Sequence, residues 1–92
     1  MSKSPTTTGG ETKLRPIHPG EILRQDLKDE GFSINGLAQA IRVPANRISL
    51  IVNGKRAVTA DTAARVARYF GTSAQYWLNL QNLFDLESVD AA

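Results

Sequence analysis

The chain has 92 residues, a net charge of +2 and no cysteine. This length is typical of one small domain, and the absence of cysteine excludes disulfides, thiol catalysis and cysteine-based zinc sites. No apolar run is long enough to span a membrane and the N-terminus lacks the apolar core of a secretory signal, so the sequence predicts a soluble, cytoplasmic protein.

The charges are distributed unevenly along the chain. Residues 31–58 contain basic side chains and no acid: Arg42, Arg47, Lys55 and Arg56. Residues 71–92 contain acids and no base. This asymmetry is typical of a protein that contacts a polyanion on one side. A chance fluctuation in a small protein explains it equally well, and charge alone leaves both interpretations open.

The first helix is expected to follow a flexible N-terminal segment. Residues 1–15 are rich in Ser, Thr, Gly and Pro and lack apolar periodicity, so we expect them to be disordered. Pro19 suits the first position of a helix, and Gly31 suits its end. The buried stripe of this helix is expected to contain Ile22, Leu23 and Leu27.

Two short helices are predicted in the middle of the chain. Ser33 is a good N-cap for the second helix, and apolar residues follow at helical spacing: Ile34, Leu37, Ala38 and Ile41. Gly36 inside this helix costs about 1 kcal/mol relative to Ala, which suggests that a neighbouring segment approaches its backbone. The third helix is expected from about Pro44 to Asn53.

Two further helices complete the predicted fold. The fourth runs from Thr59 to Gly71, and the fifth opens with a capping-box pattern from Thr72 to Gln75. The fifth is expected to end near Asp85. No segment alternates with period two, so the sequence predicts an all-α fold, a compact five-helix bundle. We expect the ordered domain to span residues 16–87 and residues 88–92 to be a flexible tail.

The third helix has two distinct faces when 100° is assigned to each residue. Its apolar arc contains Ala45, Ile48, Ile51 and Val52. The remaining face contains amides, a hydroxyl, one guanidinium and one leucine: Asn46, Arg47, Ser49, Leu50 and Asn53. Asn pairs with adenine, Arg with guanine, and an apolar side chain contacts the thymine methyl, so this face suits the major groove. The helix alone fits a polar surface with one exposed leucine equally well.

The neighbouring residues favour DNA binding. A turn of about two residues joins the second and third helices, which is the spacing of a helix-turn-helix. The start of the second helix, at Ser33 and Asn35, offers free backbone N–H groups to a phosphate. Lys55 and Arg56 follow the third helix, where the backbone of the other DNA strand would pass.

The chain resembles a HigA-type antitoxin of the Cro/phage-repressor-like (XRE) helix-turn-helix class. The resemblance covers residues 15–81 and rests on R-P-I-H-P-G-E-I-L, L-A-Q-A-I-R-V-P-A-N-R-I-S-L-I-V-N-G-K-R and T-A-D-T-A-A-R-V-A-R-Y-F-G-T-S-A-Q-Y-W-L-N-L-Q. The middle motif is shared by many repressors. H-P-G-E-I-L and Y-W-L-N-L-Q are more specific to the antitoxin branch.

The resemblance implies a lambda-repressor-like DNA-binding domain and a homodimer that binds double-stranded operator DNA and represses its own operon. It implies a HigB/RelE-like toxin partner that cleaves mRNA, and no enzymatic activity in this chain. By their positions in the motif, four residues would read bases: Asn46, Arg47, Ser49 and Leu50. Five would bind phosphates: Ser33, Asn35, Arg42, Lys55 and Arg56.

The turn between the second and third helices departs from the family pattern at two positions. Arg42 stands where glycine is common, and glycine tolerates a positive φ without cost. Pro44 stands where Ser or Thr commonly caps the helix, and it could serve as the first helical residue instead. The register of the reading helix is therefore open by one position.

The fifth helix combines a predicted core stripe with two apolar residues outside it. The stripe contains Tyr76, Trp77, Leu80, Leu83 and Phe84. Leu78 and Leu86 lie outside, and they are either isolated exposed leucines or a dimer interface. The resemblance favours the dimer, which would place two reading helices about 34–36 Å apart, one DNA turn.

No cofactor or metal site is predicted. His18 is the single histidine and has no partner ligands nearby in sequence, so we expect it to have a structural role before Pro19. Arg65 and Arg68 are expected on a solvated face, and Ser49 lacks a histidine base that would activate it as a nucleophile. The alternatives to the antitoxin are a solitary helix-turn-helix repressor without a toxin and an interaction module that does not bind DNA.

Overall fold

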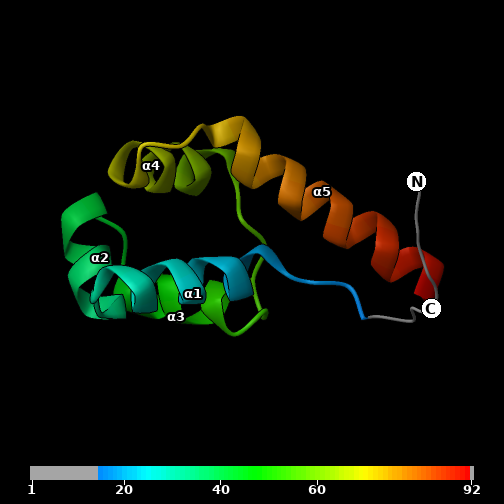
Figure 1. Cartoon of the computed structure of the whole chain (residues 1–92), viewed down its shortest axis with the longest axis horizontal. Coiled ribbons are helices and arrows are strands. Elements are labelled where there is room, and N and C mark those ends of the chain that lie inside the picture. Colours follow the sequence, from blue (N-terminus) through cyan, green and yellow to red (C-terminus); the bar gives the residue numbers. More distant parts are fainter. Residues whose placement is uncertain (1–14, 92) are drawn as a thin grey trace.

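The computed structural model describes residues 15–91, which form five helices and no strand. The helices are α1 (Pro19–Glu30), α2 (Ile34–Ile41), α3 (Ala45–Val52), α4 (Ala60–Phe70) and α5 (Ala74–Ala91) (Figure 1). The predicted all-α five-helix fold is confirmed. The segment expected to be disordered lies outside the described residues except for Arg15.

The helix boundaries follow from local capping. The Ser33 hydroxyl accepts a hydrogen bond from the Gly36 amide at 2.9 Å, and Thr59 caps α4 in the same way. Gly31 and Gly71 end α1 and α4 in the left-handed conformation, with φ of 75° and 74°. These signals are local in sequence, which is why the starts of α1, α2 and α4 and the ends of α1 and α4 agree with the prediction.

The core lies where the helices meet. α3 packs against α1 and α2, while α4 packs against α2 and α5, and α1 also contacts α5. Every helix contributes to the buried cluster: Leu23, Leu27, Leu37, Ala38, Ile41, Val43, Ile48, Ile51, Val52, Val58, Ala63, Val66, Ala67 and Trp77. Trp77 is 1% exposed, and its indole N–H donates to the Thr72 hydroxyl at 2.9 Å.

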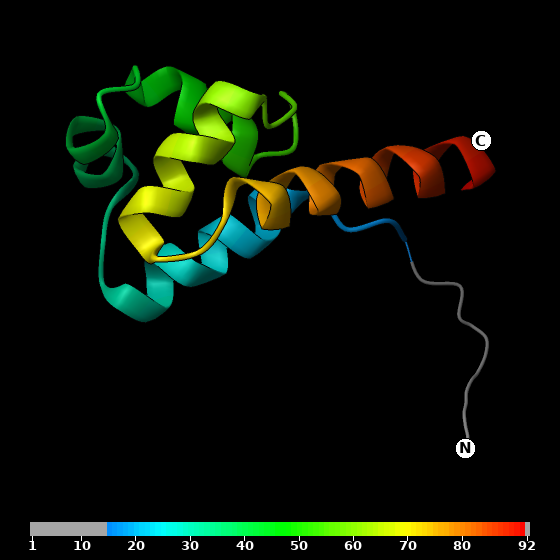
Figure 2. The same cartoon turned by 90° about the horizontal axis from the view of Figure 1, so that it is seen from above.

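The fifth helix differs from the prediction at both ends. The Ser73 hydroxyl, not that of Thr72, accepts from the helix, through the Tyr76 amide at 3.0 Å. The helix continues to Ala91 instead of ending near Asp85, so the predicted flexible tail is helical from residue 88 to Ala91. Figure 2 shows the C-terminal part of α5 extending beyond the other helices.

The predicted core stripe of α5 is wrong at two positions. Tyr76 and Leu83 are 42% and 53% exposed, because only part of this helix surface meets α1 and α4. Gln81 is buried in their place. Its side-chain oxygen accepts from the Val58 amide at 2.8 Å, and its side-chain nitrogen donates to Asp85 at 2.9 Å.

The close backbone approach expected at Gly36 is also wrong. A Cβ atom there would meet only the Ser33 hydroxyl oxygen, at 3.2 Å. The close approach occurs at Gly20 instead, where a Cβ atom would lie 1.8 Å from the backbone oxygen of Ile51. Between residues 15 and 91, no helix has the length and apolarity needed to cross a membrane.

Candidate nucleic-acid interface

The turn between α2 and α3 is built on a left-handed arginine. Arg42 has φ 60° and ψ 48°, a conformation that costs a residue with a Cβ atom about 1 kcal/mol. Its amide donates to Gln39, and the Val43 amide donates to Ala38 at 3.0 Å. Val43 is buried, at 5% exposed. Packing of Val43 therefore holds the chain in the conformation that the family pattern normally gives to glycine.

The start of α3 is now defined. Pro44 is the N-cap, with φ −55° and ψ 138°, and it contributes no side-chain hydrogen bond. Its carbonyl accepts from the Arg47 amide at 3.0 Å. The alternative in which Pro44 is the first helical residue is wrong, because its ψ is extended and α3 begins at Ala45. The register of the reading helix follows from this start.

The two faces of α3 are separated as the sequence predicts. Ile48 and Ile51 are completely buried and Val52 is 3% exposed, so these three side chains of the apolar arc lie in the core. On the other face, Asn46 and Leu50 are exposed and Arg47 and Ser49 are partly exposed. No acidic residue lies within α3. A nucleic acid that approaches this face would meet amides, a hydroxyl, a guanidinium and one leucine.

The predicted phosphate contacts lie on either side of α3. Ser33 and Asn35 are exposed at the start of α2. Lys55 and Arg56 are exposed in the loop that follows α3, where Gly54 turns the chain with φ 74° and the Lys55 amide donates to Leu50 at 2.8 Å. Within residues 15–91, ion pairs join only Arg15 with Glu21 and Arg65 with Asp61. The candidate cations of the interface therefore have no acidic partner in the described part of the chain.

A series of side-chain hydrogen bonds joins α1 to the end of α3, and the sequence analysis did not predict it. The Arg24 guanidinium of α1 donates to the side-chain oxygen of Asn53 at 2.6 Å. The side-chain nitrogen of Asn53 donates in turn to the Ser49 hydroxyl at 3.5 Å. This places a further cation beside the end of the reading helix. Arg24 and Asn53 are 29 positions apart, so no local sequence pattern could have paired them.

Arg65 is not simply solvated on the outer face of α4. It pairs with Asp61 one turn earlier, and its guanidinium donates to the Ile41 carbonyl at 2.9 Å. That carbonyl belongs to the last residue of α2, where backbone oxygens lack helical partners. Arg65 therefore stabilises the end of α2 next to the turn.

Comparisons with known proteins agree with this geometry. A model of the helix-turn-helix family matches residues 23–77. Virulence-associated protein I of Dichelobacter nodosus is 49% identical over 82 residues, which cover 88% of this chain and 76% of that protein. An addiction module antidote protein of the HigA family from Coxiella burnetii has a TM-score of 0.78 at 49% identity, covering 82% of this chain and 83% of that one. The Pseudomonas aeruginosa antitoxin HigA, solved with the higBA promoter, has a TM-score of 0.81 at 47% identity, covering 84% and 85%.

Proposed function

Because this chain belongs to the helix-turn-helix family, in its HigA-type antitoxin branch, we propose that it binds operator DNA as a homodimer, represses its own operon and neutralises a HigB/RelE-like, mRNA-cleaving toxin. The promoter in the structure of the Pseudomonas relative supports DNA as the ligand. Operator binding also implies a cytoplasmic location. The family is a DNA-binding class and not an enzyme class, so we propose no catalytic activity.

The observation that carries the proposal is the division of α3 into an apolar arc, in which Ile48, Ile51 and Val52 are buried, and an acid-free polar face. In the major groove, Arg47 would pair with guanine and Asn46 with adenine. Leu50, which is 37% exposed, would contact a thymine methyl, and Ser49 would bind either an acceptor or a donor of a base edge. A carboxylate on this face would be repelled by the phosphates, and there is none.

The phosphate contacts would fix the register of this helix on DNA without reading sequence. Lys55 and Arg56 would bind one strand after α3, and Ser33 and Asn35 would bind the other at the start of α2. The Ser33 hydroxyl accepts its capping bond from Gly36, so its own proton stays free for a phosphate oxygen. Arg42, at the turn, would add a third cation to the phosphate contacts.

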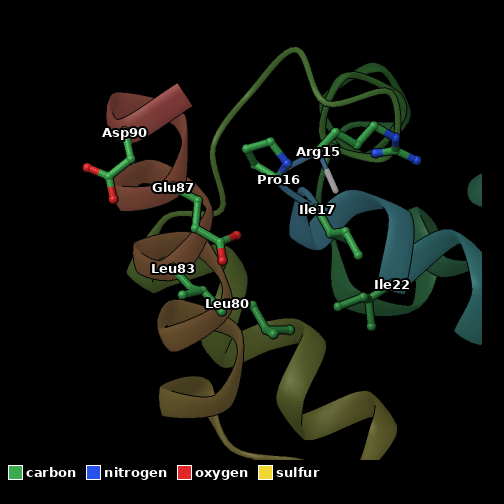
Figure 3. A pocket seen from close by; sticks show the side chains of 8 residues that line it. All are labelled: Arg15, Pro16, Ile17, Ile22, Leu80, Leu83, Glu87 and Asp90. Carbon is green, nitrogen blue, oxygen red and sulfur yellow. The ribbon is translucent and has the colours of Figure 1, made fainter. Parts of the chain in front are cut away.

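The homodimer is supported by the apolar surface of α5. Leu86 is 66% exposed. Leu78 is partly buried against its own core, so it has less surface left for a partner. Leu83, which the sequence places in the core stripe, lies with Leu80 along a groove of about 540 Å³ between α5 and the residues around the start of α1 (Figure 3). A second copy that covers Leu83 and Leu86 would remove this apolar surface from water.

The toxin part of the proposal rests on the family. The relatives solved as structures carry the names antitoxin and antidote protein, and this chain covers most of each of them. An antitoxin acts by binding its toxin, which requires a surface separate from the reading face if DNA and toxin are bound together.

The test combines co-purification with footprinting. The chain is expressed with the product of the neighbouring gene, and the purified material is footprinted on the DNA upstream of its own gene, with and without that product. A protected palindrome together with a stable complex supports the proposal. A protected site without a complex, and without rescue of growth when the neighbouring gene is expressed, would identify a solitary repressor. A complex without DNA binding at low salt would identify an interaction module.

A further inference from the structure

The H-P-G motif, which the proposed contacts to DNA do not use, lies where four parts of the fold meet. His18 is 5% exposed. Its Nδ1 accepts a hydrogen bond from the Gly20 amide at 2.9 Å and so caps α1. Its ring packs edge to face with that of Phe84 of α5, with 4.8 Å between the ring centroids and 73° between the planes. The imidazole therefore links the start of α1 to α5.

The same imidazole contacts the loop after α3. A Cβ atom on Gly54 would lie 3.8 Å from Cγ of His18 and 3.9 Å from its Cβ, so the loop lies beside the His18 side chain. The backbone carbonyl of Arg56 also interacts with the imidazole and favours its protonated form. At Gly20, a Cβ atom would overlap the Ile51 oxygen, which shows that α1 begins in direct contact with the last turn of α3.

The hydrogen-bonding pattern identifies the tautomer. Nδ1 accepts from Gly20, so the proton of the neutral ring is on Nε2, the nitrogen available to donate to the Arg56 carbonyl. Nδ1 is thus engaged by the backbone of α1, while the Nε2 proton remains available to the Arg56 carbonyl of the loop. His18 therefore contacts the start of α1 through Nδ1 and lies beside the loop at Gly54 through its Cβ and Cγ atoms.

We infer that His18 is a positioning residue for operator binding, which holds the Lys55–Arg56 loop and the end of α3 in register with α1 and α5. The inference rests on the proposed function, because the loop is proposed to bind phosphates. It assigns to H-P-G a role that differs from contact with DNA. Movement of this loop relative to α3 would separate the phosphate contacts from the base contacts that they align.

The capping hydrogen bond of His18 is sensitive to pH because Nδ1 must stay unprotonated to accept from the Gly20 amide. A proton there would remove the acceptor and place a positive charge at the positive end of α1. Burial lowers the pKa of His18, while Asp85 of α5, Glu21 of α1 and the Arg56 carbonyl oppose this effect. The other charged residues that line the same pocket as His18 are cationic: Arg15, Arg24 and Lys28. Acidification is therefore expected to release the loop.

The test uses His18→Asn and measures operator affinity by fluorescence anisotropy from about pH 8 down to about pH 4.5, because burial lowers the pKa of His18 below its ordinary value. Asn places an oxygen near the position of Nδ1 and is a preferred N-cap, but it lacks the Nε2 donor and does not titrate. Wild-type affinity should weaken about fivefold at the acidic end, as expected for loss of one hydrogen bond. His18→Asn should already be weakened by a similar factor at neutral pH and should show no further loss. The matched control Arg68→Ala, which removes an exposed cation of α4, should retain the wild-type affinity and pH profile.

A second measurement follows the backbone directly. The chain contains one histidine, so a single imidazole signal in the NMR spectrum gives its titration midpoint, and the amide signals of residues 54–56 should shift with that midpoint. Wild-type affinity and pH profile in His18→Asn, loss of the pH profile in Arg68→Ala, or loop amide signals that do not follow the imidazole titration would each overturn the inference. If wild type fails to distinguish operator from scrambled DNA, the proposed function fails, and the amide titration still decides the role of His18.

Discussion

Gly20 and Ile51 are in direct backbone contact: a Cβ atom on Gly20 would lie 1.8 Å from the Ile51 oxygen. Glycine is required there by the distance between two helices and not by an unusual φ. The contact fixes the position of the start of α1 against the end of α3. It thereby also fixes the position at which the loop that carries Lys55 and Arg56 leaves α3.

Gly20→Ala should destabilise the fold by about 3 kcal/mol or more, at the upper end of the range for overpacked sites. The added carbon overlaps a backbone oxygen, which cannot rotate away as a side chain would. Chemical unfolding monitored by circular dichroism measures the change. The matched control is Gly36→Ala, where the nearest atom outside the helix backbone is the Ser33 hydroxyl, and the change should stay below about 1 kcal/mol in either direction. Equal effects at the two glycines would contradict the prediction.

Arg42→Gly should stabilise the fold by about 1 kcal/mol relative to Arg42→Ala. Both variants remove the same charge, but only glycine relieves the positive φ of 60°. Comparison of their unfolding free energies isolates the free-energy cost of the positive φ. Both variants should weaken operator binding to the same extent, because the proposed phosphate contact is lost in each. A more stable alanine variant would show that the turn is not strained.

Arg47→Ala should cost about 1–3 kcal/mol of operator affinity and relax the preference at one base pair. The effect should be measured on the matched operator and on a set of single-base variants, because loss of a phosphate contact would weaken all of them equally. Arg68→Ala is the control, since Arg68 is an equally cationic residue on the exposed side of α4. Uniform weakening across all base variants would move Arg47 from the base-reading set to the phosphate contacts.

Leu86→Asp should shift the protein from dimer to monomer without unfolding it. Leu86 is 66% exposed, so a carboxylate there costs little in the monomer and a great deal in an apolar interface. Sedimentation velocity gives the oligomeric state, and binding to the full palindrome should weaken together with it. Leu86→Met keeps the volume and the apolar character and should remain dimeric. A dimer that survives Leu86→Asp would place the subunit contact elsewhere.

Asp26→Asn should raise the unfolding free energy at neutral pH by less than about 1 kcal/mol. Burial raises the pKa of Asp26, and the nearby Asp29 and Glu30 raise it further. A carboxyl group with a raised pKa in the fold is disfavoured when ionised, so its penalty is present at neutral pH and disappears as pH falls through that pKa. The gain from Asn should therefore vanish in acid. A gain that persists at low pH would point to packing instead of charge.

Most helix boundaries could be predicted because caps act within one turn. The N-caps Ser33 and Thr59 indicate helix starts, and the glycines Gly31 and Gly71 indicate helix ends. The two faces of α3 were also predictable, since helical spacing alone separates Ile48 and Ile51 from Asn46 and Leu50. The end of α5 was not predictable in this way. No Gly or Pro terminates it, and the sequence after Asp85 carries no signal that distinguishes a helix from a tail.

The sequence by itself determined the five helices, the two faces of α3 and the family, because these depend on residue type and on spacing within a few turns. Tertiary structure decided what depends on residues far apart in the chain. It joined Arg24 to Asn53 and Gln81 to Val58, brought Gly20 against Ile51, and placed His18 between the loop and α5. It also decided which side of α5 is covered, leaving Leu83 outside and Gln81 inside. A helical pattern shows which residues share a face, but only the packing of its neighbours selects the face that is buried.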